Sequence, residues 1–325
     1  MDLFKSYQKE FKTSLEKYIS NKSPQNLYRP MEYLLGLGGK RVRPYLCLMA
    51  SEVFGIPPIK AMGAAISIEI FHNFTLMHDD IMDKASLRRG NKTVHEKWDV
   101  STAILSGDAM LIKAYQAIEC YSPEIFLKLT RLLSKTAIEV CEGQQYDLDF
   151  ETAPVVSQEE YIKMIRLKTA VLVGCALKMG AIIGGASVKD IDAIYDFGIH
   201  LGVAFQLQDD YLDSFGDQSI FGKKIGGDIL ENKKTILYHL ALKNADLKQY
   251  DLLKSLLMGD CSLNNEDKIK KIKGLYEKTG AKKATRQLIF YHSDVAIKKL
   301  EKIAISAKQK ASFFGLKDWL INRTY

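Results

Sequence analysis

Residues 197–213 read FGIHLGVAFQLQDDYLD, and this stretch decides the fold. Apolar side chains recur at Phe197, Leu201 and Phe205, which is the spacing of a helix with a buried face. The stretch ends in a pentad with three aspartates, Asp209, Asp210 and Asp213. Like charges in an apolar setting are unfavourable unless cations neutralise them. The stretch therefore predicts a buried helix that carries a cation site.

A similar pentad lies upstream in residues 76–83, LMHDDIMD, with Asp79, Asp80 and Asp83. Aspartates four residues apart lie one turn apart on one helix face. Carboxylates are the hard oxygen ligands that magnesium prefers, and no histidine or cysteine stands at zinc-ligand spacing. A single pentad could equally be a solvated acidic turn. Two pentads on apolar helices predict two walls of one metal site.

The placement of proline indicates an all-α protein. All seven prolines precede Val155, so the second half of the chain contains no proline helix breaker. Helical spacing recurs and sustained alternation is absent, while glycine, proline and polar clusters mark breaks between about ten helices. No linker divides the chain, so we expect one helical domain over residues 1–325.

Composition narrows the function. The net charge is +7 with lysines spread along the chain, and no nucleic-acid-binding motif occurs, so an anionic small molecule is the expected partner. Five cysteines without a Cys-x-x-Cys pair indicate a reducing compartment. The first residues lack the pattern of a signal peptide, and no apolar run reaches the length of a membrane span. We expect a cytoplasmic protein.

Basic segments accompany the pentads. They are residues 38–44 (GGKRVRP), Arg88-Arg89-Gly90, Lys168-Thr169, and the pair Lys224 and Lys233. Guanidinium groups bind phosphate with two hydrogen bonds, and glycine lets the main chain approach it. One basic loop is usually solvated surface, but four such segments beside two acidic pentads indicate a site for diphosphates and magnesium.

These motifs, in this order, resemble those of the trans-isoprenyl diphosphate synthases. The resemblance runs from Gly38 to Lys234 and includes Gly143-Gln144, residues 205–213 and residues 224–228 (KIGGD). It implies a large antiparallel helical bundle around a central cavity, usually a homodimer. The implied reaction is head-to-tail condensation of isopentenyl diphosphate with an allylic diphosphate.

The resemblance also implies roles for individual residues. Three magnesium ions would be held by Asp79, Asp83 and Asp209, with Asp80, Asp210 and Asp213 completing the metal-binding set. The allylic diphosphate would contact Arg88, Lys168 and Lys224, although Lys223 could stand in for Lys224, and Lys233 would help to close the site. Isopentenyl diphosphate would be held by Gly39, Lys40, Arg43, His72 and Arg89. Without the resemblance, His72 would be interpreted as a core histidine.

The reaction passes through an allylic cation, which nearby dipoles can stabilise. Candidates are the Thr169 hydroxyl, the Gln206 amide and the Lys168 carbonyl, with Gln144 and Asp147 as further polar positions. No dedicated protein base stands out, and in the family the departing diphosphate is thought to take the proton. His78 is expected only to pack or to form a hydrogen bond.

Product length depends on side chains that precede the first pentad. An ideal helical wheel puts Phe71 and Thr75 on the Asp79 face, whereas in the family the usual determinants match Phe74 and Thr75. The combination of one large and one small residue at these two positions resembles the pattern in synthases that make the twenty-carbon geranylgeranyl product. Phe74 could instead be ordinary core, and farnesyl diphosphate synthase is the nearest alternative.

Two other classes of protein are alternatives that can be tested. A terpene cyclase normally replaces the second pentad, which is intact here, and a non-catalytic synthase subunit would normally have lost a pentad or a diphosphate cation. The C-terminus lacks the basic triplet of some farnesyl synthases, although Arg323 could contribute. The segment from Asn244 to Lys283 is expected to be a peripheral helical region.

Overall fold

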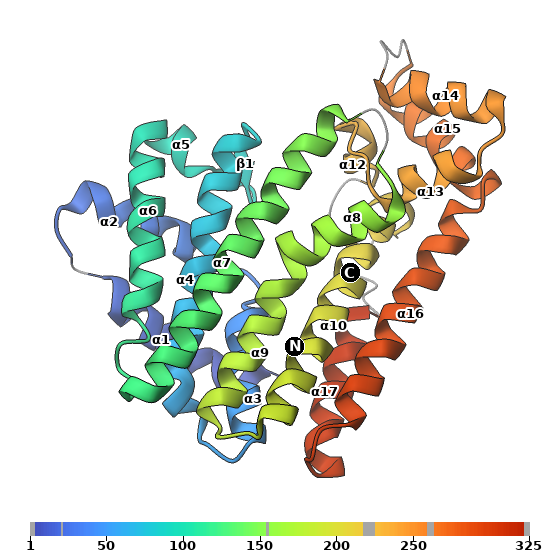
Figure 1. The fold of residues 1–325 in the computed structure, drawn as a ribbon. Coiled ribbons are helices and arrows are strands. Elements are labelled where there is room, and N and C mark those ends of the chain that lie inside the picture. The colour runs from blue at the N-terminus through green and yellow to red at the C-terminus, as the bar shows by residue number, and fades with distance from the viewer. Residues whose placement is uncertain (1–3, 21, 154–155, 217–224, 259–262, 322–325) are drawn as a thin grey trace. The chain divides into compact units, whose positions relative to one another are not determined.

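The computed structural model describes residues 4–20, 22–153, 156–216, 225–258 and 263–321, and nearly all of these are helical (Figure 1). Backbone contacts group the chain into two compact units. Unit 1 comprises residues 1–136, 172–195 and 303–305, and unit 2 comprises residues 137–171, 196–302 and 306–325. Helices α7 (Pro123–Thr152) and α10 (Val188–Phe215) each have residues in both units.

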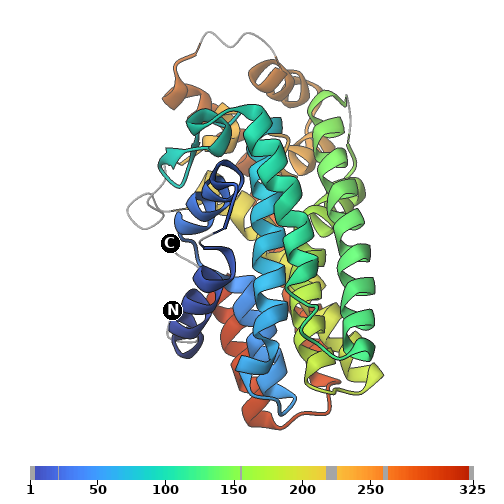
Figure 2. The same cartoon turned by 90° about the vertical axis from the view of Figure 1, so that its left-hand side faces the viewer.

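Unit 1 is built around α4 (Met62–Met82), whose side chains are apolar on most sides. Helix α6 (Val100–Gln116) lies alongside α4, as both ribbon views show (Figures 1 and 2). The two helices approach closely at Gly107, where a Cβ atom would lie 2.2 Å from the His78 Nε2 atom. The other helices of the unit are α1 (Lys5–Ile19), α2 (Gln25–Gly36), α3 (Val42–Val53), η2 (Pro58–Ala61), α5 (Val94–Lys97) and most of α9 (Val171–Ile183).

A short hairpin follows the first pentad. Strands β1 (Leu87–Arg88) and β2 (Asn91–Lys92) pair antiparallel across a turn at Arg89 and Gly90, both of which have positive φ. They are the only strands in the part of the chain that the structure describes. The expectation of an all-α protein is confirmed, and the hairpin serves to present the two arginines.

Unit 2 contains the rest of α7 and α10. Its other helices are α8 (Gln158–Ile165), α12 (Gly227–Leu230), α13 (Ile236–Asn244), α14 (Leu247–Met258), α15 (Asn265–Lys278), α16 (Ala281–Glu301) and α17 (Ala307–Ile321). A π-helical turn, η3 (Arg166–Ala170), connects α8 to α9. Turns of this kind are often found at functional sites, because they re-aim side chains within a helix.

The sequence located most helix boundaries and missed some. Breaks at Pro24, Gly38, Pro57, Gly90 and Gly184 fall between helices as expected. Breaks near Ala245, Gly280 and Ile303 were not predicted, so the described residues contain more helices than the ten or so expected. Gly280 has a φ of 76°, a left-handed conformation that glycine adopts readily and that ends α15. Among the described residues, no helix combines the length and apolar character needed to cross a membrane.

Candidate active site

The first pentad lies at the C-terminal end of α4 in unit 1. Asp79 is partly exposed and Asp83 is exposed, whereas Asp80 is only 1% exposed. The Asp80 carboxylate accepts hydrogen bonds from Arg88 Nε at 2.8 and 2.9 Å and pairs with Arg88 Nη2 at 2.7 Å. A bidentate guanidinium contact of this kind combines charge with fixed geometry. The structure therefore couples the hairpin to the pentad through an ion pair.

The second pentad lies on α10 in unit 2 and repeats this burial pattern. Asp209 and Asp213 are partly exposed, and Asp210 is buried. Asp210 accepts hydrogen bonds from the Tyr161 hydroxyl at 2.6 Å and from Gln206 Nε2 at 3.1 Å. Burial raises the pKa of Asp210 to about 7, even though both hydrogen bonds act in the opposite direction. Both groups that donate these hydrogen bonds to Asp210 are neutral.

A fourth carboxylate stands beside the second pentad. Burial, and after it the charge of Asp228, raises the pKa of Asp213 to about 6. The Asp228 backbone N–H donates to Asp213 Oδ2 at 3.0 Å, and Gly226 N–H donates to the Asp213 carbonyl at 2.7 Å. On α15, the pKa of the buried Tyr276 hydroxyl is raised chiefly by burial and further by Asp228 and Asp213. Helix α15 thus brings a buried hydroxyl close to this acidic region, while the absence of a catalytic role for residues 244–283 stays a prediction.

The pentads can be tested as magnesium ligands from their donor atoms. Within the described ranges, no three histidine, cysteine, aspartate or glutamate side chains converge into a ready-made metal cluster. The accessible groups are carboxylates, which are the ligands that magnesium prefers. Among the accessible groups, burial, and after it the charge of Asp228, raises the pKa of Asp213, and a bound divalent cation would stabilise its ionised form. The donor set therefore fits magnesium.

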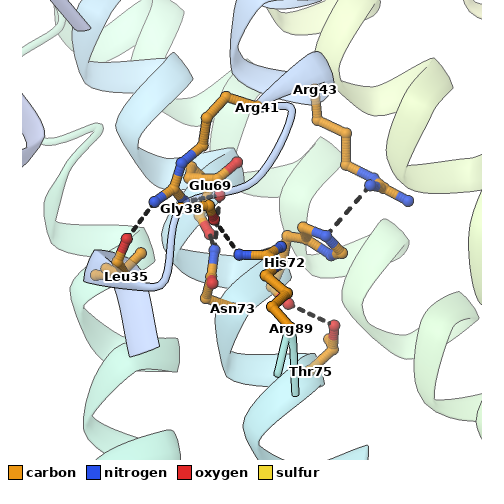
Figure 3. Close-up of polar contacts among 9 residues, drawn as sticks. All are labelled: Leu35, Gly38, Arg41, Arg43, Glu69, His72, Asn73, Thr75 and Arg89. Carbon is orange, nitrogen blue, oxygen red and sulfur yellow. Dashed lines mark hydrogen bonds and ion pairs between the residues drawn. The ribbon is translucent and has the colours of Figure 1, made fainter. Parts of the chain in front are cut away.

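The basic loop before α3 forms a close contact with the hairpin (Figure 3). Arg89 donates a hydrogen bond from Nη1 to the Gly38 carbonyl. Gly39 has a φ of 126°, a backbone conformation that favours glycine, and a Cβ atom there would lie 2.7 Å from Arg89 Nη2, so a side chain at this position would displace the end of Arg89. Lys40, next along the chain, is exposed. Gly39, Lys40 and Arg89, predicted from separate motifs, lie in one region of unit 1.

One of the loop's three cations is turned inward. Arg41 pairs with the buried Glu69 of α4 and donates to the Leu35 carbonyl, as Figure 3 shows. Asn73 also donates to Glu69 Oε1, at 2.7 Å. Arg41 therefore anchors the loop to α4, which leaves Lys40 and Arg43 as the loop's candidate phosphate ligands.

His72 lies beside Arg43, and both side chains are half-buried. Arg43 Nη1 stands 3.3 Å from His72 Nε2. Because a guanidinium group only donates, Nε2 accepts and the ring hydrogen is on Nδ1. Desolvation, followed by the charges of Arg43, Arg89, Arg88 and Arg41, holds the pKa of His72 well below its usual value. The imidazole is neutral and can act as a hydrogen-bonding group rather than as a cation.

The candidate chain-length residues occupy the helix turns before Asp79. Phe71 is fully buried, and its ring lies 5.6 Å from the ring of Phe74. Phe74 is partly exposed and meets the His78 ring edge-on at 4.9 Å. Thr75 Oγ1 donates to the His72 carbonyl at 2.8 Å. His78 also lies 3.2 Å from the Ile104 carbonyl, which confirms that it packs and forms a hydrogen bond.

In unit 2, the predicted pair Lys168 and Thr169 lies on the π-helical turn. Lys168 pairs with Asp147 of α7. A Cβ atom at Gly143 would lie 2.2 Å from the Lys168 backbone nitrogen, so glycine permits α7 and the turn to approach. Thr169 Oγ1 donates to Gln206 Oε1 at 3.3 Å. Since Gln206 in turn donates to Asp210, a chain of hydrogen bonds joins the turn to the second pentad.

Gln144 is a buried polar group that lacks a partner. The residue is only 8% exposed, and neither Nε2 nor Oε1 has a hydrogen-bond partner among the described residues. An unsatisfied buried amide is unfavourable by about 1–3 kcal/mol, so such groups are uncommon in native proteins. This supports the prediction that Gln144 contacts a ligand.

The lysines after the second pentad differ in their surroundings. Lys233 lies 2.7 Å from Glu231 and 3.5 Å from Asp228. Lys234 Nζ donates to the carbonyls of residues 150, 151 and 153, at 3.1, 2.9 and 2.8 Å, and so caps the C-terminal end of α7. Lys223 and Lys224 lie outside the described residues, as does Arg323.

Sequence reasoning missed several residues that support the site. They are Glu69, Tyr161, Asp228 and Tyr276. Asp228 had a signal in the sequence, because it ends the segment KIGGD. A buried glutamate within the apolar run of α4 also indicates a partner, since charged residues are rarely buried unpaired.

An all-α fold with two aspartate pentads, each beside phosphate-binding candidates, defines a prenyltransferase of the isoprenoid-synthase type. Residues 24–276 match the polyprenyl synthetase family model. The chain is 37% identical over 312 residues, 96% of its length and 95% of the relative's, to a short chain isoprenyl diphosphate synthase of Methanothermobacter thermautotrophicus. The chain belongs to the polyprenyl synthetase family.

Two further relatives bear on the product. A geranylgeranyl pyrophosphate synthase of known structure matches with a TM-score of 0.94 and 48% identity over 99% of both chains. A geranylfarnesyl diphosphate synthase of Natronomonas pharaonis is 40% identical over 232 residues, which are 66% of this chain and 68% of that protein. Similar sequences thus carry names that specify different products.

Proposed function

We propose that this prenyltransferase condenses isopentenyl diphosphate with allylic diphosphates and releases geranylgeranyl diphosphate. The observation that carries the product assignment is the pairing of a large Phe74 with a small Thr75. Phe74 is held between the rings of Phe71 and His78, so its position is fixed by packing. One fixed aromatic limits the tail, and the small neighbour leaves more space than a second aromatic would.

The isopentenyl diphosphate site is proposed on unit 1. Its members are Gly39, Lys40, Arg43, His72 and Arg89. Support comes from the contact between Arg89 and the Gly38 carbonyl and from the close approach of the Arg89 guanidinium to the Gly39 backbone. The neutral imidazole beside Arg43 adds to it. Fixed cations bind a diphosphate through charge-assisted hydrogen bonds. The neutral imidazole beside them can add a hydrogen bond, but it is not an acid that could protonate the substrate.

The allylic diphosphate is proposed to contact Arg88, Lys168, Lys224 and Lys233. Magnesium ions, three per site by family resemblance, would be held by Asp79, Asp83 and Asp209, with Asp213 close by and Asp80 and Asp210 as supports. Bound magnesium neutralises the charge that develops on a departing diphosphate. The buried position of Asp80 and Asp210 supports their role in orienting the pentads rather than in direct contact with an ion.

The groups that face the allylic cation are proposed to be uncharged. Thr169 and Gln206 are hydrogen-bonded to each other, which fixes the direction of the amide dipole. Gln206 Oε1 accepts from Thr169 and Nε2 donates to Asp210, so the amide oxygen lies on the Thr169 side. A fixed dipole stabilises a developing cation without forming a bond to it. Gln144 is proposed as a further polar contact to substrate.

The test is product analysis. Purified protein is incubated with magnesium, labelled isopentenyl diphosphate and each allylic primer in turn, and the hydrolysed products are sized. A dominant twenty-carbon product is expected. A dominant fifteen-carbon product would establish the farnesyl alternative, and no turnover by correctly folded protein would favour a non-catalytic subunit.

Two variants locate the floor of the pocket. Phe74→Ala is expected to lengthen the product by at least one five-carbon unit, because it removes the fixed ring. Thr75→Phe places a second aromatic beside the first and is expected to shift the product towards fifteen carbons. Product sizing of both variants checks the assignment, and an unchanged distribution in both would show that other residues set the length.

A homodimer in the cytoplasm is also proposed. Support for association comes from the face of α6, where Val100, Ile104, Leu105 and Ile112 are between 44% and 61% exposed. Exposed apolar side chains gathered on one helix are typical of a protein interface. Support for a reducing compartment comes from Cys47, a buried thiol that forms no disulfide. Light scattering of the purified protein tests the association.

A further inference from the structure

Two histidines meet in unit 2, away from the residues assigned to the reaction. His200 lies on α10, more than two turns before the second pentad, and His292 lies on α16. Their Nδ1 atoms are 3.0 Å apart, and their ring centroids are 5.3 Å apart. With one hydrogen between them, one ring donates and the other accepts.

Charged groups surround this histidine pair. Asp196, one turn before His200 on α10, pairs with Lys299 of α16 at 2.6 Å. Arg166 also acts on His200 from the π-helical turn. His292 is 8% exposed, and the Tyr291 ring lies edge-on to it at 5.2 Å. The pair is therefore a partly enclosed site with one carboxylate nearby.

Both rings are neutral near pH 7. Burial, and then the charge of Lys299, lowers the pKa of His200, while burial lowers the pKa of His292 to about 4. A neutral imidazole has a free lone pair and is the form that binds zinc, copper or nickel. Neither ring needs to lose a net proton on binding. The ring that now carries its hydrogen on Nδ1 would carry it on Nε2 instead.

The spacing of the nitrogens suits a shared metal ion. Two imidazole nitrogens, each about 2.0–2.1 Å from one ion at an angle between square and tetrahedral, lie about 2.9–3.4 Å apart. The observed 3.0 Å falls in this range. Small side-chain rotations would aim both lone pairs at one point, without movement of either helix.

We infer that His200 and His292 form a site for a divalent transition-metal ion of the zinc, copper or nickel class, which links α10 to α16. The described part of the chain brings no third histidine, cysteine or acidic ligand to the pair, so water completes the coordination. The site is chemically distinct from the carboxylate pentads, because imidazole favours these metals and carboxylate favours magnesium.

The test is zinc binding by untagged, metal-free protein in excess magnesium, which keeps the carboxylates occupied. Calorimetry is expected to find one zinc ion per chain, and zinc is expected to raise the melting temperature because it binds the folded form. His200→Asn and His292→Asn should each weaken binding by about tenfold or more, since loss of even an outer-shell partner typically weakens metal binding by about 10- to 100-fold. His95→Gln removes an imidazole from unit 1 and is the matched control, expected to bind as the unaltered protein does.

Copper gives a second readout that needs no variant. The paramagnetic resonance spectrum of one copper ion per chain should show coupling to two nitrogens in the unaltered protein, and to one in either asparagine variant that still binds. Circular dichroism checks that each variant folds. The inference is overturned if the unaltered protein binds no zinc at micromolar concentrations, if its copper spectrum lacks two-nitrogen coupling, or if both asparagine variants bind zinc as tightly as the unaltered protein. In that case the two rings form only a hydrogen-bonded pair.

Discussion

The two aspartate pentads have the same pattern of burial but opposite electrostatic support. In each, the second aspartate is buried and the first and fifth are accessible. Asp80 is held by the Arg88 guanidinium. Asp210 is held by a phenol and an amide, and burial raises its pKa to about 7.

The difference shows that two kinds of interaction can hold the buried aspartate of the same motif. In unit 1 a fixed cation, Arg88, pairs with Asp80 and ties the pentad to the hairpin. In unit 2 neutral donors aim Asp210 but leave most of its charge uncompensated. In the first pentad a protein cation therefore offsets part of the negative charge that would attract a metal ion. In the second pentad less of that negative charge is offset.

The largest predicted effect is a difference in stability loss between variants of the two buried aspartates. Asp80→Asn should lower the free energy of unfolding by about 2–3 kcal/mol, because it breaks a largely buried ion pair. Asp210→Asn should change it by less than about 1 kcal/mol, because the amide oxygen can still accept from Gln206, the amide N–H group can donate to the Tyr161 hydroxyl oxygen, and no buried charge remains. Urea unfolding of both variants without metal, at pH 8, provides the measurement. Equal losses would show that the two carboxylates are supported alike.

Two glycines extend the comparison to the segments that are proposed to bind phosphate. At Gly143 a new Cβ meets the backbone of Lys168, which cannot move easily, so Gly143→Ala should destabilise by roughly 2 kcal/mol. At Gly39 it meets the end of the Arg89 side chain, which can move, and the left-handed backbone adds strain of about 1 kcal/mol.

The functional readouts of these glycine variants should also differ. Gly39→Ala is expected chiefly to raise the KM for isopentenyl diphosphate, because it displaces Arg89. Gly143→Ala should lower kcat, because it displaces Lys168. Gly36→Ala, where a Cβ would meet nothing within 4 Å, is the matched control and should leave both constants unchanged. A larger stability loss at Gly39 than at Gly143 would contradict the comparison.

The smallest effect concerns His239, whose ring lies 5.3 Å from the Tyr161 ring behind the second pentad. Burial lowers the pKa of His239 to about 4 from an ordinary 6.5. The unfolded chain therefore takes up a proton first, and stability falls as the pH drops from about 6.5 towards 4. His239→Gln should remove on the order of 1 kcal/mol of this fall.

Comparison of the two unfolding curves between pH 7 and pH 4.5 isolates the contribution of His239, because the other histidines are common to both proteins. Parallel curves would show that His239 does not contribute to the acid sensitivity of unit 2.

The sequence was sufficient for the fold class and for the identity of the pentads. Helical spacing placed Asp79 and Asp83 on one face and turned Asp80 aside, which matches its burial. The family resemblance selected His72, which spacing alone would have assigned to the core. These features are local, because they depend on periodicity and on short motifs.

Features that depend on contacts distant in sequence were not predictable. The three cations of residues 40–43 are equivalent as a string, and only the position of Glu69 shows that Arg41 is internal. The Tyr161 hydroxyl reaches Asp210 from 49 residues away. The π-helical turn has no proline or glycine to mark it, and the isolation of the Gln144 amide is visible only once its neighbours are placed.

The cap formed by Lys234 has a consequence for covalent labelling. Its ammonium group gives its three hydrogens to three carbonyls at the end of α7, whereas the neighbouring Lys233 side chain is 58% exposed. An amine-reactive probe should therefore modify Lys233 quickly and Lys234 only when the end of α7 frays. The ratio of the two labelling rates, read by mass spectrometry, reports how often that helix end opens.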